Sequence, residues 1–165
     1  VETKGPFYFR IVRCEVEPNE LFDGYEFQLG KGVTAYDQGR DVGLVSTGYM
    51  IKTAKIAARK LQQQGIGVRV DHHPSLKPFD RELLYDLARK VSCMVTLENH
   101  CTSGGLYSLV AEALAAKGIG IPVGAIGTDP DDFIHTGHVN DLLYRYKMTS
   151  DDVVEKAITV LKEQK

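Results

Sequence analysis

The sequence contains no tryptophan and only three cysteines among its 165 residues. The cysteines are odd in number and lack the spacing of zinc or redox sites, so we expect reduced thiols and a cytoplasmic protein. No apolar run approaches the roughly 18–20 residues that span a bilayer, which argues against a membrane protein. The first residue is Val1 instead of Met, and we therefore expect a piece of a longer chain or a processed one.

Neither sign of charge predominates, because the sequence has 20 Lys and Arg residues and 22 Asp and Glu residues, which gives a formal net charge of -2. Without a basic run, we expect no nucleic-acid partner. A Walker loop and a GxSxG nucleophile elbow are also missing. The GxG pairs at 65–67 and 118–120 precede predicted strands, whereas a dinucleotide-binding turn follows one. These absences leave no self-contained active site in the sequence.

Strands and helices are predicted to alternate along the chain, because short apolar runs alternate with apolar residues at helical spacing. Strands that are joined by helices pair in parallel through right-handed connections, so the pattern predicts a parallel α/β core. Pro122 favours an edge position or a start for the last strand. The predicted strands are 7–13, 42–45, 68–70, 92–97 and 121–126, with a hairpin or edge strand at 27–36. The predicted helices are 51–61, 80–91, 105–117, 141–146 and a last one after Thr149.

Polar residues gather where the predicted core strands end, at 46–48, 71–73, 98–100 and 127–129, which we call the strand-end rim. Ligands of parallel α/β sheets usually bind beyond the carboxyl ends of the strands. Gly104 and Gly105 directly precede a helix, whose backbone N–H groups could hold an anion. We favour the alternative that these loops are simply solvated and that the glycines let the helix pack closely. The candidate anion-binding residues are Glu98, Asn99, His100, Gly104 and Gly105.

Two kinds of catalytic chemistry are conceivable at the rim. Glu98 with His100, or Asp71 with a neighbouring histidine, could act as an acid/base pair, although hydrogen-bonded loop anchors are the simpler interpretation. His135 and His138 are three residues apart, but such a pair is a weak indication of a metal without a third ligand at defined spacing, and we expect no metal site. The possible companions of His135 and His138 for a metal are His72, His73, Cys101 and Asp129.

Two arginines, Arg10 and Arg13, lie on the first predicted strand. Their odd spacing puts them on opposite faces, so at most one of them serves a given site. The planar guanidinium suits phosphate binding, while a surface salt bridge is equally consistent with the spacing.

Seven segments, spread over nearly the whole chain, match a known protein family in the same order. They are GPFYFRIVR at 5–13, FQLGKG at 27–32, the segment 41–70, LKPFD at 76–80, VTLENHCTSGGLYSLVAEAL at 95–114, PVGAIGTDPDDFIHTG at 122–137 and the segment 142–157. Together they resemble the C-terminal third of transketolase-like thiamine diphosphate enzymes. The resemblance implies a three-layer α/β/α sandwich around a five-stranded, mostly parallel mixed sheet with one antiparallel strand. It also implies that residues 1–26 end a preceding pyrimidine-binding domain and its linker, and that residues 27–165 form the transketolase C-terminal domain.

The resemblance implies a function for the complete enzyme only. Such enzymes transfer a two-carbon ketol unit between sugar phosphates with thiamine diphosphate and Mg²⁺. The diphosphate-binding GDG segment is missing here, so we expect the isolated chain to bind no cofactor, to be inactive, and to serve structure and dimerisation. Its implied partners are the N-terminal domains or an N-terminal subunit of the same enzyme, in a homodimer. Arg13 matches the family arginine that holds the substrate phosphate, and Arg10 is the lesser candidate.

Other branches of the family end in the same kind of domain. Deoxyxylulose phosphate synthases and the beta subunits of 2-oxo acid dehydrogenases are therefore alternatives, as is a regulatory module that binds an anion. The strand FYFRIVR is most similar to transketolase. The loop of His72, His73 and Pro74 and the amide of Asn99 depart from the common pattern.

Overall fold

A five-stranded sheet forms the centre of the protein, in the order β1-β3-β2-β4-β5. The computed structural model describes residues 4–12 and 25–163. β1 pairs antiparallel with β3, and the other three pairings of the sheet are parallel. The predicted mixed, mostly parallel sheet is therefore confirmed, with its antiparallel strand at one edge. The strands are β1 (Val33–Gln38), β2 (Val42–Ser46), β3 (Val68–His72), β4 (Cys93–Cys101) and β5 (Val123–Thr128).

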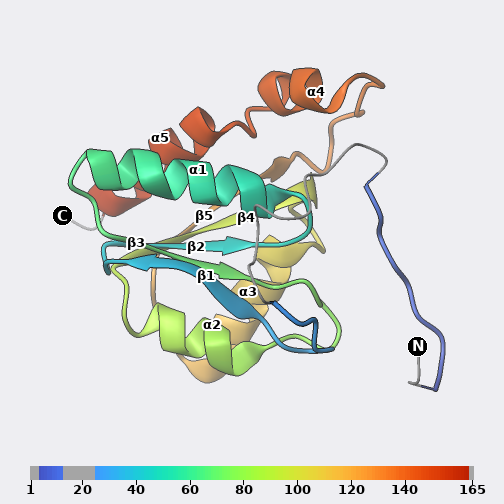
Figure 1. Ribbon diagram of the computed structural model, residues 1–165, viewed down its shortest axis with the longest axis horizontal. Coiled ribbons are helices and arrows are strands. Elements are labelled where there is room, and N and C mark those ends of the chain that lie inside the picture. The colour runs from blue at the N-terminus through green and yellow to red at the C-terminus, as the bar shows by residue number, and fades with distance from the viewer. Residues whose placement is uncertain (1–3, 13–24, 164–165) are drawn as a thin grey trace.

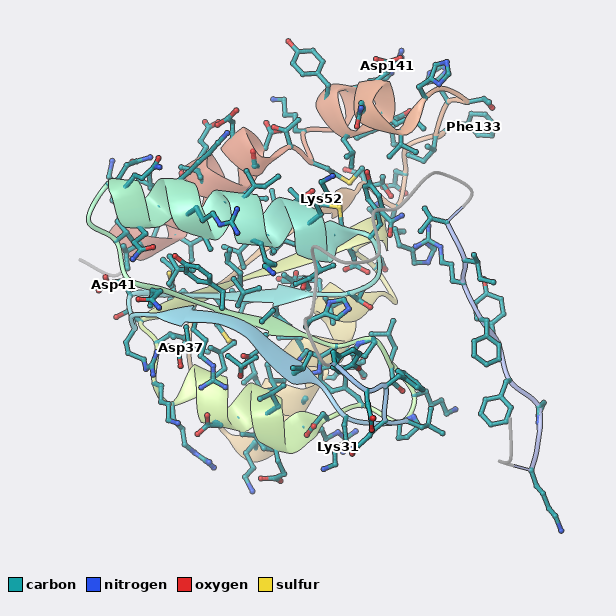
Figure 2. All side chains as sticks on the ribbon, in the orientation of Figure 1. Lys31, Asp37, Asp41, Lys52, Phe133 and Asp141 are labelled. Carbon is teal, nitrogen blue, oxygen red and sulfur yellow. The ribbon has the colours of Figure 1, made fainter. Side chains whose placement is uncertain are left out.

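Helices cover both faces of the sheet, so that the predicted three-layer sandwich is also confirmed (Figure 1). Helices α1 (Met50–Gln63) and α5 (Ser150–Lys162) lie on one face, and α2 (Arg81–Ala88) and α3 (Leu106–Lys117) lie on the other. The short helix α4 (Val139–Arg145) has no buried residue and lies beyond the end of α5, outside the sandwich. Figure 2 shows Phe133 and Asp141 at this outer end of the molecule.

Successive residues of the strands point to opposite faces, and this alternation builds two apolar clusters. In β2, Leu44 packs in the cluster under α1 and α5, whereas Val45 packs in the cluster under α2 and α3. All five residues of β2 and of β3 are buried, as expected of strands that are covered on both faces. This double coverage explains the continuous apolar run of β2, whereas β3 also carries the buried polar residues Arg69, Asp71 and His72.

Local signals in the sequence set several of the helix boundaries. Gly65 follows α1 with φ +78, a conformation that glycine adopts without strain. Asp80 begins α2, because its carboxylate accepts a hydrogen bond from the Leu83 amide at 3.2 Å. Thr149 and Asp152 form the reciprocal capping box that starts α5. The predicted starts of α2 at residue 80 and of α5 after Thr149 are confirmed.

Two predictions about strands were wrong. Residues 7–12 form no strand, although their apolar alternation is typical of one, because no second strand pairs with them in the described part of the chain. β4 does not end at Leu97 but continues to Cys101, with a shift in its register against β5 before Cys101 pairs with Thr128. The polar residues 98–100 therefore belong to a strand and not to a loop.

Candidate functional site

The carboxyl ends of the four parallel strands meet at one edge of the sheet, as the parallel pairing requires. This edge carries the strand-end rim, and Figure 1 shows the N-terminal segment running past the same side of the molecule. The end of β3 supplies the most buried polar side chains of the rim, and β2, β4 and β5 supply one each.

Glu98 is the acid of β4, and it is 1% exposed. Its Oε2 accepts a hydrogen bond from the Leu106 amide at 2.6 Å, and its Oε1 accepts one from the Tyr107 amide at 2.9 Å. Burial raises the pKa of the Glu98 carboxyl, while these two amides favour its ionised form. The N-terminus of α3 thus holds a carboxylate from the same chain, and binding of an external anion there stays a prediction.

Gly105 is the residue that lets this carboxylate approach the helix. A Cβ atom at position 105 would lie 2.0 Å from Oε2 of Glu98 and 2.4 Å from the carbonyl oxygen of Cys101. Gly104 differs, since a Cβ atom there would meet nothing within 4 Å and its φ is +73. Its amide donates to Oγ of Ser108 at 2.8 Å. Gly105 therefore serves close packing, whereas Gly104 serves a turn.

Replacing Gly105 with alanine is expected to lower the free energy of unfolding by about 3 kcal/mol, because neither the buried carboxylate nor the backbone oxygen can move away cheaply. Urea unfolding followed by circular dichroism measures this loss. Gly120→Ala is the matched control, since no atom of the described residues lies within 4 Å of a Cβ there, and it should change stability by less than about 0.5 kcal/mol. Equal losses in both variants would contradict the packing role of Gly105.

The end of β4 also receives the N-terminal segment. The guanidinium of Arg10 donates from Nη1 to Oδ1 of Asn99 at 3.1 Å and from Nη2 to the Asn99 carbonyl oxygen at 2.7 Å. Asn99 is half-buried, and His100 is exposed. Arg13, the main candidate for the substrate phosphate, lies outside the described residues, so its role stays a prediction.

Asp71 is held by an arginine instead of a histidine. The Arg69 guanidinium donates from Nε to Oδ1 of Asp71 at 2.9 Å and from Nη2 to Oδ2 at 3.0 Å. Its Nη1 donates to Asp86 of α2 at 2.8 Å, and Nη2 also donates to Thr34 of β1 at 3.2 Å. Arg69 and Asp71 are 5% and 0% exposed. This buried network ties β3 to α2 and β1, which favours the interpretation of Asp71 as a structural anchor.

The two histidines at the end of β3 are buried in different surroundings. Nδ1 of His72 lies 3.1 Å from Oγ of Ser46 on β2. The ring of His73 stacks on Phe79 at 4.5 Å, and neither of its ring nitrogens has a hydrogen-bond partner among the described residues. Burial lowers the pKa of each histidine to about 4, so both rings are neutral at pH 7.

A metal site would need at least three ligands close together. Within residues 4–12 and 25–163, no three side chains of His, Cys, Asp or Glu are grouped so that they could hold a metal ion. The exposed His135 and His138 therefore gain no third ligand there. None of the helices described combines the length and the apolar character needed to cross a bilayer.

Sequence reasoning missed Arg69 and the contact between Arg10 and Asn99. Arg69 stands between two valines of a strand that is buried on both faces, and an arginine in such a place needs a buried acid as its partner. This signal was available in the sequence. No sequence signal pointed from Arg10 to Asn99, because the two residues are 89 positions apart.

Known proteins resemble this chain over most of its length. A family model described as "Transketolase, C-terminal domain" matches residues 30–153. The 1-deoxy-D-xylulose-5-phosphate synthase of Methylacidiphilum infernorum is 39% identical over 77% of this chain and 20% of its own length. The 6-deoxy-6-sulfo-D-fructose transketolase subunit SqwH of a Clostridium species is 35% identical over 93% of this chain and 46% of its own length.

A solved structure is similar as well. It is described as a split gene transketolase in an inactive beta4 tetramer, and it superposes with a TM-score of 0.80 at 38% identity. The match covers 87% of this chain and 46% of the other. The chain thus spans about a fifth of the synthase and about half of the other two proteins.

Proposed function

From its membership of the transketolase C-terminal domain family, to which this chain belongs, we propose that it is the C-terminal part of a transketolase. The complete enzyme transfers a two-carbon ketol unit between sugar phosphates with thiamine diphosphate and Mg²⁺. The observation that carries this proposal is the match to proteins that are named transketolase subunits and that are about twice as long as the matched region. These are the Clostridium protein and an apulose-4-phosphate transketolase subunit of Phocaeicola vulgatus, which is 29% identical over 99% of this chain.

In this proposal the chain supports the active site instead of performing the chemistry. Its partners are the N-terminal domains or the N-terminal subunit, which bind the cofactor, and the assembly is a cytoplasmic homodimer. The split-gene relative supports inactivity of the chain alone, since its beta4 tetramer is described as inactive. Residues 1–26 end the preceding pyrimidine-binding domain, and residues 27–165 form the C-terminal domain. Arg13 holds the substrate phosphate, a role for which the resemblance offers Arg10 as the lesser candidate.

A deoxyxylulose phosphate synthase is the second candidate. The 39% identity to the Methylacidiphilum synthase exceeds the identity to either transketolase subunit, although it extends over a shorter part of the chain. In that case the same domain supports synthesis of 1-deoxy-D-xylulose 5-phosphate. The three-layer fold serves both candidates equally, so that activity decides between them.

Reconstitution tests the proposal. The chain is expected to show no turnover alone and to support ketol transfer that depends on thiamine diphosphate once it is combined with the preceding domains. Transfer between ketose and aldose phosphates is measured by coupled assay, and the products are identified by mass spectrometry. Formation of 1-deoxy-D-xylulose 5-phosphate alone would favour the second candidate. A reconstituted, folded assembly that performs neither reaction would contradict both.

A further inference from the structure

We propose that Arg10 acts as a clasp, held by Asn99, that fixes the N-terminal segment (residues 4–12) to the end of β4, and that it is not a ligand of the substrate phosphate. The contact itself lies within this chain. Its consequence for the complete enzyme rests on the proposed function, in which the segment ends the preceding domain. The clasp would then fix the path of the chain between the two domains.

The geometry of the contact fits a guanidinium fork closely. The two terminal nitrogens of Arg10 donate to two acceptors of one residue, the side-chain oxygen of Asn99 at 3.1 Å and its backbone oxygen at 2.7 Å. The shorter distance is typical of a hydrogen bond from a charged donor. One planar group thus donates hydrogen bonds to both the backbone and the side chain of a single strand residue, which gives the contact a defined orientation.

Asn99 is held in a defined position because hydrogen bonds fix the residues beside it. Glu98, the preceding residue, is bound by two amides of α3. The Thr47 amide of the turn after β2 donates to the Leu97 carbonyl oxygen at 3.1 Å. Gly48 in the same turn faces the Asn99 amide, since a Cβ there would lie 3.8 Å from Oδ1. The clasp therefore attaches where β4, α3 and the β2–α1 turn meet.

Charge supports the same pairing. The positive charge of Arg10 favours the ionised form of Glu98 and so opposes the rise that burial causes in the pKa of that carboxyl. Arg10 therefore lies in the field of a buried acid, as well as on the neutral amide of Asn99. An anionic acceptor at position 99 would strengthen the contact, and a cationic side chain there would repel Arg10.

The rest of the segment adds little apolar packing to the body of the protein. The side chains of Tyr8, Phe9 and Ile11 are 89%, 63% and 86% exposed. Phe7 and Phe9 stack on each other at 5.9 Å, within the segment itself. Figure 2 shows the segment running apart from the sandwich with its aromatic rings in the open. Because few other contacts hold the segment, the loss of the Arg10 hydrogen bonds should have a measurable effect on how tightly it is held.

The test uses the absence of tryptophan from the chain. Tyr8→Trp introduces a single tryptophan, which is excited selectively over the tyrosines, near the clasp at a side chain that is 89% exposed. Fluorescence anisotropy then reports whether the segment is held. Asn99→Lys and Arg10→Ala are each expected to shift the ratio of held to released segment by about fivefold toward release. The double variant Arg10→Ala with Asn99→Lys should show the same fluorescence anisotropy as Arg10→Ala alone. Asn99→Asp should shift the equilibrium toward the held segment.

His100→Lys is the matched control, because it adds a positive charge one residue further along the strand, on an exposed side chain. The anisotropy should stay unchanged in this variant and on addition of inorganic phosphate. An unchanged anisotropy in Asn99→Lys would overturn the proposal, and so would release of the segment by phosphate. Circular dichroism of each variant shows that the domain is folded. The readout needs no turnover, so loss of the clasp and failure of the proposed transketolase activity are separate results.

Discussion

Lowering the pH from 7 to 4 is expected to reduce the free energy of unfolding by about 3 kcal/mol for each of two buried histidines, His72 and His73. Burial lowers the pKa of each to about 4, while an unfolded histidine titrates near 6.5. Below pH 6.5 the unfolded chain therefore binds protons that the folded chain does not bind. This part of the stability is fully present above pH 6.5 and is lost as the pH falls toward 4.

Other groups also face these rings or titrate in the same range. The nearby Asp80 favours the protonated form of His73, and the raised pKa of Glu98 stabilises the folded state as the pH falls. Urea unfolding at pH 7 and at pH 4 measures the sum of these effects. His73→Phe isolates one histidine, because it keeps an aromatic ring against Phe79 and removes the titration.

The loss between the two pH values should fall by about half in His73→Phe. His135→Phe is the matched control, since His135 is exposed. Between pH 7 and pH 4 this variant should lose as much free energy of unfolding as the unsubstituted chain. A pH dependence that is the same in both variants would show that the buried ring of His73 does not carry it.

Replacing Asp71 with alanine is expected to lower the free energy of unfolding by about 3 kcal/mol, since it removes both hydrogen bonds of one buried guanidinium edge. Arg69 would keep its hydrogen bonds to Asp86 and Thr34, but its Nε would lose its acceptor. The arginine is only 5% exposed, so this loss occurs in a buried site. Urea unfolding at pH 7 measures the loss.

The control for this variant is Asp37→Ala, which removes an ion pair between side chains that are 38% and 46% exposed, those of Asp37 and Arg40. That loss should be less than about 1 kcal/mol. The double variant Arg69→Met with Asp71→Leu should recover most of the stability lost in Asp71→Ala, because it removes the unpaired charge. Equal losses in the two aspartate variants would rule out a special contribution of the buried pair.

The fold could be predicted from the sequence because its signals are local. The apolar run of β2 reflects burial on both faces, and Pro122 correctly marked the start of an edge strand. The antiparallel strand came from the family resemblance and was confirmed as β1. Residues 7–12 misled the prediction, since alternation shows that a segment can form a strand but not that a partner is present.

The candidate site could be located but not interpreted from the sequence. The strand-end rim is where the parallel pairing places it, yet Glu98, Asn99 and His100 look like loop residues because they are polar. Glu98 is buried only because two amides that follow it by eight and nine residues satisfy its carboxylate. Asp71 is only two positions from Arg69, but Asp86, its other acidic partner, lies 17 positions away, and Asn99 lies 89 positions from Arg10. Such contacts depend on the tertiary fold and leave no periodic trace.

The order of the strands bears on how the protein folds during synthesis. β1 is synthesised before the other four strands of the sheet but pairs with β3, so it stays unpaired until about 30 further residues have been added. The face under α1 is completed by α5, which packs against α1, β4 and β5. In a nascent chain this apolar face would thus stay partly uncovered until α5 has been made.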